Sequence, residues 1–241
     1  TIGKTEHDGA TEWTIVGAGI NQHLYDQSKF NTIVTNAAQM KANSVVEENA
    51  DDLAQYGLET PAAQFTTSFS DGTEKTIEIG GVNPSGTSLY IKEKGDNTVY
   101  TYSNYKLNYF TNYTATSFVL TQVMEAYDSQ TAPVITKLTV KRKDMEKDVV
   151  LEALPEPDEN SDSINVYSHM FTSPFNCYID FNDGPAYLYG LYGLNAKSAA
   201  YLEVNDETKG KTGLLDPQCE VAMLVEDTIY RLYIGDAVEE T

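Results

Sequence analysis

Arginine is scarce in this 241-residue sequence, and positive charge is scarce with it. Sixteen lysine and arginine residues, of which only Arg142 and Arg231 are arginine, face 36 acidic residues, which gives a net charge of −20. The segment up to Thr131 carries −9 (7 basic, 16 acidic) and the remainder −11 (9 basic, 20 acidic), so both halves are acidic. Such a surface repels phosphate groups, which argues against binding to nucleic acid or to an anionic lipid surface.

Long hydrophobic runs are also lacking. No apolar segment is long enough to span a bilayer, and the sequence contains no signal peptide. The chain opens at Thr1 without an initiator methionine, so we expect that an upstream piece has been removed. Composition does not tell whether that piece is a membrane anchor.

Cysteine and histidine, the residues that most often mark redox, metal or nucleophilic chemistry, are few. Cys177 and Cys219 are too few for a disulfide framework, and we interpret them as small buried apolar residues, with one bridge between them as the alternative. His7, His23 and His169 stand in separate contexts, without metal-ligand or nucleophile-elbow spacing. The sequence therefore predicts no catalytic residue, no cofactor and no metal site.

Three short motifs suggest chemistry, and each has a simpler structural interpretation. The glycines at 17 and 19 follow a strand but lack the third glycine of a dinucleotide loop, so we expect a turn. Adjacent Asp51 and Asp52 suit the start of a helix better than acid–base catalysis. The segment 155–163 has the early spacing of a calcium loop, but Ser163 replaces its glycine and His169 its last glutamate, which favours a solvated acidic loop.

The first half predicts a mixture of helices and antiparallel hairpins. Asp26 stands at an N-cap position ahead of apolar residues at helical spacing, which indicates a helix over 27–40. Asp71-Gly72 between two alternating segments is a strong hairpin signal. The other expected elements are loose residues at 1–12, strands at 12–16 and 42–48, a short helix ending at Gly57, hairpin strands at 64–69 and 75–79 and at 87–92 and 98–102, a helical segment at 105–125 and a linker at 127–133.

The second half predicts more strands. A returning hairpin is expected around Lys143-Asp144, and Asp183 with Pro185 indicates the start of a helix. Expected strands are 134–141, 147–154, 164–171 and 176–181, followed by a final hairpin of 219–225 and 228–234 around Glu226-Asp227.

Part of the first half returns about 156 residues later. Lys41–Glu47 aligns with Lys197–Glu203, and the order of the following landmarks is kept. The aligned pairs are Asn49 with Asn205, Gly57 with Gly213, Leu58 with Leu214, Pro61 with Pro217, Ile79 with Ile234, Gly80 with Gly235, and the Asp26 helix with the Asp183 helix. We interpret this as a duplication with one unit at 1–131 and a second at 132–241. The first copy lacks a leading hairpin and the second a trailing one, so we expect the sequence to be an excerpt of a longer protein.

These landmarks resemble a known family. The segment Asp52–Pro61 (DLAQYGLETP), the turn Asp71-Gly72, the segment Ile77–Gly80, Tyr90 and the strand residues Val99-Tyr100 are similar to the bacterial domain-of-unknown-function family numbered 4340. The resemblance runs from about Trp13 to Tyr105 and is weaker in the second half, where Thr212 replaces the tyrosine before Gly-Leu. Its relatives include auxiliary components of gliding-motility-type ABC transporters. The resemblance implies an extracytoplasmic, membrane-anchored accessory protein and supplies no catalytic residues.

The sequence thus predicts an α+β protein of two related units, each with helices packed on an antiparallel sheet. The first functional hypothesis is a non-enzymatic module, outside the cytoplasm of a bacterium, with a protein partner such as ABC transporter subunits. The alternatives are glycan or cell-wall binding and, less favoured, a hydrolase. A glycan would stack on exposed tyrosine rings, although core packing explains tyrosines at these spacings equally well. The candidate ligand surface consists of Tyr100, Tyr102, Tyr105, Tyr109 and Tyr113.

Overall fold

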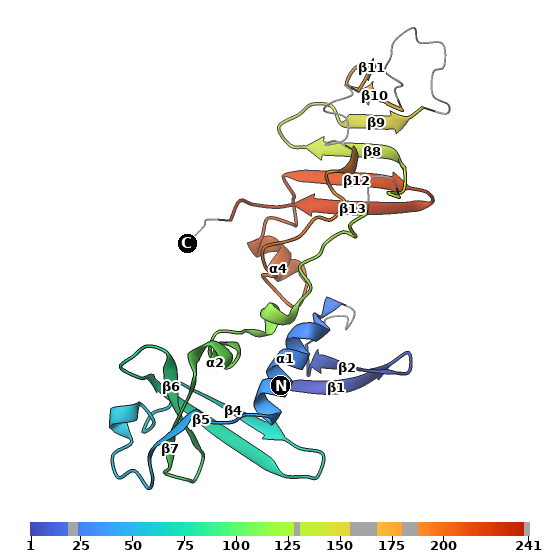
Figure 1. Cartoon of the computed structure of the whole chain (residues 1–241). Coiled ribbons are helices and arrows are strands. Elements are labelled where there is room, and N and C mark those ends of the chain that lie inside the picture. Colours follow the sequence, from blue (N-terminus) through green and yellow to red (C-terminus); the bar gives the residue numbers. More distant parts are fainter. Residues whose placement is uncertain (19–23, 128–130, 155–167, 180–187, 239–241) are drawn as a thin grey trace. The chain divides into compact units, whose positions relative to one another are not determined.

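The protein is an α+β protein in which antiparallel sheets dominate. The computed structural model describes residues 1–18, 24–127, 131–154, 168–179 and 188–238 (Figure 1). The chain forms two compact units: unit 1 is Thr1–Leu120 with Ser198–Leu202, and unit 2 is Thr121–Lys197 with Glu203–Thr241. Every strand pairing within the described residues is antiparallel, as the alternating sequence pattern predicts.

Unit 1 begins with a hairpin that packs beside a helix. Strands β1 (Ile2–His7) and β2 (Ala10–Ile15) pair along their whole length, so the prediction that residues 1–12 are loose is wrong. Asp8 and Gly9 both have positive φ, as the tight hairpin turn demands, and the Asp-Gly signal was therefore present in the sequence. Helix α1 (Gln27–Ala38) confirms the predicted helix and its N-cap at Asp26.

A five-stranded sheet, in the order β3-β7-β6-β5-β4, follows α1 in unit 1 (Figure 1). Asp71-Gly72 turns β4 into β5 and β6 pairs with β7, so both predicted hairpins are confirmed. The short helix is a single 3-10 turn, η2 (Ala54–Tyr56), which Gly57 ends at a φ of 66°. The strands are β3 (Ser44–Glu47), β4 (Ala63–Ser68), β5 (Glu74–Val82), β6 (Ser88–Glu93) and β7 (Val99–Ser103).

The helical segment after this sheet is shorter than predicted. Helix α2 (Asn104–Thr111) buries Leu107 against the sheet, and a 3-10 turn, η3 (Ala115–Phe118), follows it. The prediction of helix through residue 125 is wrong because Thr114 and Ser117 form a capping box, which starts the new 3-10 turn and breaks the helical run.

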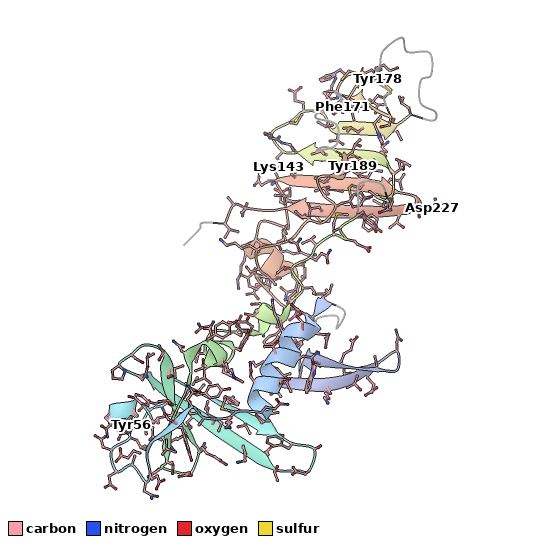
Figure 2. The ribbon with its side chains drawn as sticks, viewed as in Figure 1. Tyr56, Lys143, Phe171, Tyr178, Tyr189 and Asp227 are labelled. Atoms are coloured by element: carbon pink, nitrogen blue, oxygen red, sulfur yellow. The ribbon has the colours of Figure 1, made fainter. Side chains whose placement is uncertain are left out.

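Unit 2 is built on a six-stranded sheet in the order β11-β10-β9-β8-β12-β13. The predicted hairpins around Lys143-Asp144 and Glu226-Asp227 are confirmed, and Figure 2 shows Asp227 at the second turn. The strands are β8 (Ile135–Arg142), β9 (Val149–Ala153), β10 (His169–Ser173), β11 (Cys177–Tyr178), β12 (Cys219–Val225) and β13 (Thr228–Ile234), and helix α4 (Asp206–Lys211) is fully within the described residues. A core on one face of the sheet contains Ile135, Leu138, Leu151, Met223 and Leu188.

Several predictions of the second half concern residues that the structure does not describe. The calcium-loop residues Asp158, Asn160 and Asp162 and the helix start at Asp183 lie outside the described ranges, as do residues 164–167 of a predicted strand. Cys177 and Cys219 are described, and both are free thiols.

The hairpin β12–β13 has the same register as β4–β5. Ala63 pairs with Ile79 in unit 1, and Cys219 pairs with Ile234 in unit 2, at the offsets that the sequence alignment predicts. All the pairs that follow along the two ladders keep this correspondence.

The turn before each hairpin also has the same hydrogen bonds. The Leu58 amide donates to the Leu53 carbonyl at 3.0 Å, and the equivalent Leu214 amide donates to the Lys209 carbonyl at 2.8 Å. Residues 197–203, in contrast, form no strand, although they align with β3.

Candidate functional site

The five predicted tyrosines do not share one exposed face. Tyr102 is only 3% exposed and belongs to the core of the sheet, whereas Tyr105 is 78% exposed. Tyr109 and Tyr113 are half-buried and pack edge to face against each other, with ring centroids 5.0 Å apart. The charge of neighbouring Tyr105 raises the pKa of Tyr109. Tyr100 is half-buried and packs on the core of the sheet. The cluster therefore offers one exposed ring.

Two titratable residues singled out in the sequence, His169 and Asp52, have structural roles. His169 is buried, with Nε2 2.7 Å from the Ile135 carbonyl oxygen and Nδ1 2.9 Å from Ser168 Oγ. Asp52 accepts a hydrogen bond from the Ala54 amide at the start of η2. His23 and the side chain of His7 lie outside the described part. Among the described residues, no three histidine, cysteine or acidic side chains gather in a way that could hold a metal ion.

An open groove of about 570 Å³ lies between α1, β4 and the β1–β2 hairpin of unit 1. We call it the apolar groove. Most of its lining side chains are hydrophobic, and β4 adds short hydroxyl side chains. Its lining residues are Thr1, Ile2, Trp13, Ile33, Val34, Ala37, Phe65, Thr66, Thr67, Ser68, Glu74 and Phe110.

Helix α1 supplies one wall because of how its start is fixed. Asp26 accepts hydrogen bonds from the amides of Ser28 and Lys29; burial by itself would raise the pKa of this carboxyl, but the hydrogen bonds outweigh burial and lower it. Behind this cap, Phe30 and Ile33 are buried in the core, and Ile33 also lines the groove together with Val34.

The hairpin is held beside α1 by a pair of hydrogen bonds. The side-chain amide of Gln27 accepts from the main-chain amide of Trp13 at 2.9 Å and donates to its carbonyl at 3.0 Å. The Trp13 indole N–H in turn donates to Asn31 on the next turn of the helix, at 3.1 Å. The helix therefore positions the only tryptophan at the groove.

Strand β4 forms the opposite wall and is the outer strand of its sheet within the described residues. The ring of Phe65 stacks on that of Phe110 from α2, with centroids 4.0 Å apart. A second depression, of about 340 Å³, shares Ala37 and Thr67 with the apolar groove and continues it across the sheet toward Tyr100 and Lys92. The two depressions therefore adjoin at Ala37 and Thr67, and both are open to solvent.

This geometry is suited to binding. An open wall of aliphatic and aromatic side chains with short hydroxyl side chains beside them resembles the surfaces on which proteins receive other proteins. The groove brings together side chains of β1, β2, α1, β4, β5 and α2, so spacing alone did not predict it. The local signals were Ile33, Val34 and Ala37, which follow the helical period, and Phe65, which follows the alternation of a strand.

The comparisons with known proteins agree with the resemblance seen in the landmark residues. The profile of the family described as Domain of unknown function (DUF4340) matches residues 13–168, which is 156 of the 241 residues. The chain belongs to this family. Comparison with curated proteins gave no match, and comparison with solved structures gave none either. Among the described residues, no helix is long and apolar enough to cross a membrane.

Proposed function

We propose that the protein is a non-enzymatic, extracytoplasmic module that binds a protein partner while tethered to a bacterial membrane. The partner that the family resemblance favours is a subunit of an ABC transporter. The observation that carries the proposal is the apolar groove, because a soluble protein seldom leaves a connected surface of this kind without a partner.

We further propose that the chain holds two tandem copies of one structural unit. The identical register of β4–β5 and β12–β13 supports duplication, as do the matching hydrogen bonds of the preceding turns. Gly80 and Gly235 add to this support. A Cβ at Gly80 would overlap the carbonyl oxygen of Tyr56, and a Cβ at Gly235 would overlap that of the equivalent Thr212.

The alternative function, glycan or cell-wall binding, has less support. It requires a platform of exposed rings, and of the five candidate tyrosines only Tyr105 is exposed by more than half.

The proposal is tested by photocrosslinking in native membranes. A photoreactive amino acid replaces Thr66, which lines the apolar groove, and a matched protein carries it at Glu59, which is exposed and outside the groove. We expect the protein labelled at position 66, but not the one labelled at position 59, to form a covalent adduct. Mass spectrometry should identify the crosslinked partner as an ABC permease, and the ATPase should be recovered with it.

Equal labelling from both positions, or none, would contradict the proposal. Retention of the protein on cell-wall glycan, lost on Tyr105→Ala, would instead support the alternative.

A further inference from the structure

A separate pocket of about 230 Å³ lies in unit 2, beside the core of its sheet. We call it the tyrosine pocket, because Tyr127, Tyr192 and Tyr230 all line it. Val225 of β12 also lines it and is buried, with Ile135 of β8 paired on one side and Thr228 of β13 on the other. The sheet continues on both sides of this point, so the pocket does not depend on an open strand edge.

Two of the three rings meet as adjoining walls of a corner do. The ring centroids of Tyr127 and Tyr192 lie 5.0 Å apart, and the two ring planes are inclined by 75°. The Tyr192 ring also stacks on that of Tyr189, at 6.1 Å, and this contact supports it. Tyr230 brings the third ring from β13.

Hydrogen bonds to the protein fix both rings of the corner. The Tyr127 hydroxyl donates to the Glu125 carboxylate at 2.9 Å, and the Tyr192 hydroxyl donates to the Pro133 carbonyl at 3.0 Å. The hydrogen bond to Glu125 raises the pKa of Tyr127, and burial raises that of Tyr192. Both phenols are therefore neutral at neutral pH, with their hydroxyl protons already used, and the ring faces are what they offer to a ligand.

The charge at the tyrosine pocket is negative. Glu125 and Glu226 line it, and no lysine or arginine is among the described residues that do so. The surrounding chain carries a net charge of −20, which raises the local concentration of cations. Two carboxylates supply fewer oxygen ligands than the about six that calcium or magnesium takes, so the pocket suits an organic cation better than one of these metal ions.

We propose that the tyrosine pocket binds a small organic cation through a trimethylammonium group. Aromatic rings attract such a group through their negative faces, and it carries no N–H donor that would be left unpaired away from water. A primary ammonium brings three donors, whereas one oxygen of Glu125 already accepts from Tyr127. The volume lies below the roughly 300–1,000 Å³ of pockets for drug-sized ligands, as a small cation requires.

The ligand class is tested by calorimetric titration of the 241-residue chain with three probes. Choline carries the trimethylammonium group, its neutral isostere has carbon in place of the nitrogen, and ethanolamine has a primary ammonium on the same short chain. We expect choline to bind at least about tenfold more tightly than the neutral isostere, because the shape is kept and only the charge is lost. Ethanolamine should also bind more weakly than choline.

Two tyrosines of β13 provide a matched pair of variants. Tyr230 and Tyr233 are 46% and 48% exposed, but only Tyr230 lines the tyrosine pocket. We expect Tyr230→Leu to weaken choline binding about fivefold or more, Tyr230→Phe to keep most of the affinity because the ring remains, and Tyr233→Leu to leave it unchanged. Circular dichroism checks that each variant is folded.

A lipid arm identifies the source of the group. Phosphatidylcholine carries trimethylammonium next to a phosphate, which Glu125 and Glu226 would repel, so we expect no sedimentation of the chain with phosphatidylcholine vesicles. Sedimentation that choline displaces and Tyr230→Leu abolishes would support the site and make the lipid head group its ligand.

Three results would overturn the inference. They are no binding of choline, equal binding of choline and its neutral isostere, and equal losses in Tyr230→Leu and Tyr233→Leu. The inference goes beyond the proposed function, and none of these results changes the crosslinking expected at Thr66 in unit 1, so the two can fail separately.

Discussion

Lys92 and Glu78 form a salt bridge that is almost closed to water. Their charged atoms lie 2.9 Å apart, and the side chains are only 7% and 13% exposed. Lys92 also donates to the Asp96 carbonyl at 3.3 Å, so the ammonium has two acceptors. Breaking a buried pair costs far more than breaking an exposed one, since the remaining charge stays in a poor solvent.

Replacing only one member of this pair should therefore destabilise unit 1. We expect Lys92→Met to lower the free energy of unfolding by roughly 3–5 kcal/mol, and the double variant with Glu78→Leu to recover most of the loss. Lys75→Met, which breaks the exposed pair with Glu93, is the control and should cost less than about 1 kcal/mol. Urea unfolding measures all three, and equal costs for Lys92→Met and Lys75→Met would contradict this account.

Individual residues were predicted best where the signal was local. The cap at Asp26 and the turn at Asp71-Gly72 depend only on neighbouring main-chain groups, and both predictions are confirmed. The burial of Lys92 could not be predicted, because it results from a cross-strand glutamate and from the packing of the whole sheet. The Asp8-Gly9 turn carries the same local signal and was overlooked, because β1 contains few apolar residues.

At the scale of elements, each of the two equivalent hairpins closes against the turn that precedes it. Gly80 lies against the carbonyl of Tyr56, and Gly235 lies against that of Thr212. Both contacts are with main chain, which cannot move aside as a flexible side chain could. Both positions should therefore require glycine, because any side chain there would collide with a main-chain carbonyl of the preceding turn.

Alanine at either glycine should force the turn away from its hairpin. We expect Gly80→Ala and Gly235→Ala each to lower the free energy of unfolding by about 1–3 kcal/mol. Gly210→Ala in α4 is the matched control, because its Cβ would make only an ordinary contact with Leu215 and alanine favours a helix. Thermal unfolding of the three variants tests this prediction. If Gly80→Ala or Gly235→Ala left the free energy of unfolding unchanged, the result would argue against equivalent turns.

Hairpins were more predictable than the elements joining them. The ranges of β12 and β13 match the sequence prediction, because alternation and a two-residue turn specify an antiparallel pair locally. The helix predicted over 105–125 breaks after α2, since apolar spacing does not reveal the competing cap at Thr114. The apolar groove needed the approach of α1 to β4, which no local pattern specifies.

For the molecule as a whole, each unit has a surface or an edge that its described elements leave uncovered. Unit 1 presents the apolar groove beside the outer strand β4, and in unit 2 no described strand pairs with the outer side of β13. Strand β12 of unit 2 is equivalent to β4 of unit 1. Strand β8 pairs with the outer side of β12, whereas no described strand pairs with the outer side of β4. Under the proposed function, the apolar groove is the surface through which a partner would bind, and the charge of −20 would oppose association of two copies.

The central claim is that the protein acts by binding a membrane-associated protein partner. The most direct measurement is hydrogen exchange on the complex recovered from membranes, compared with the free chain. We predict slower exchange in residues 63–68 of β4 and in residues 33–37 of α1, with the turn at Asp71-Gly72 unchanged as the internal control. Unchanged exchange at the groove, together with protection of residues 105–113 by cell-wall glycan, would contradict the account.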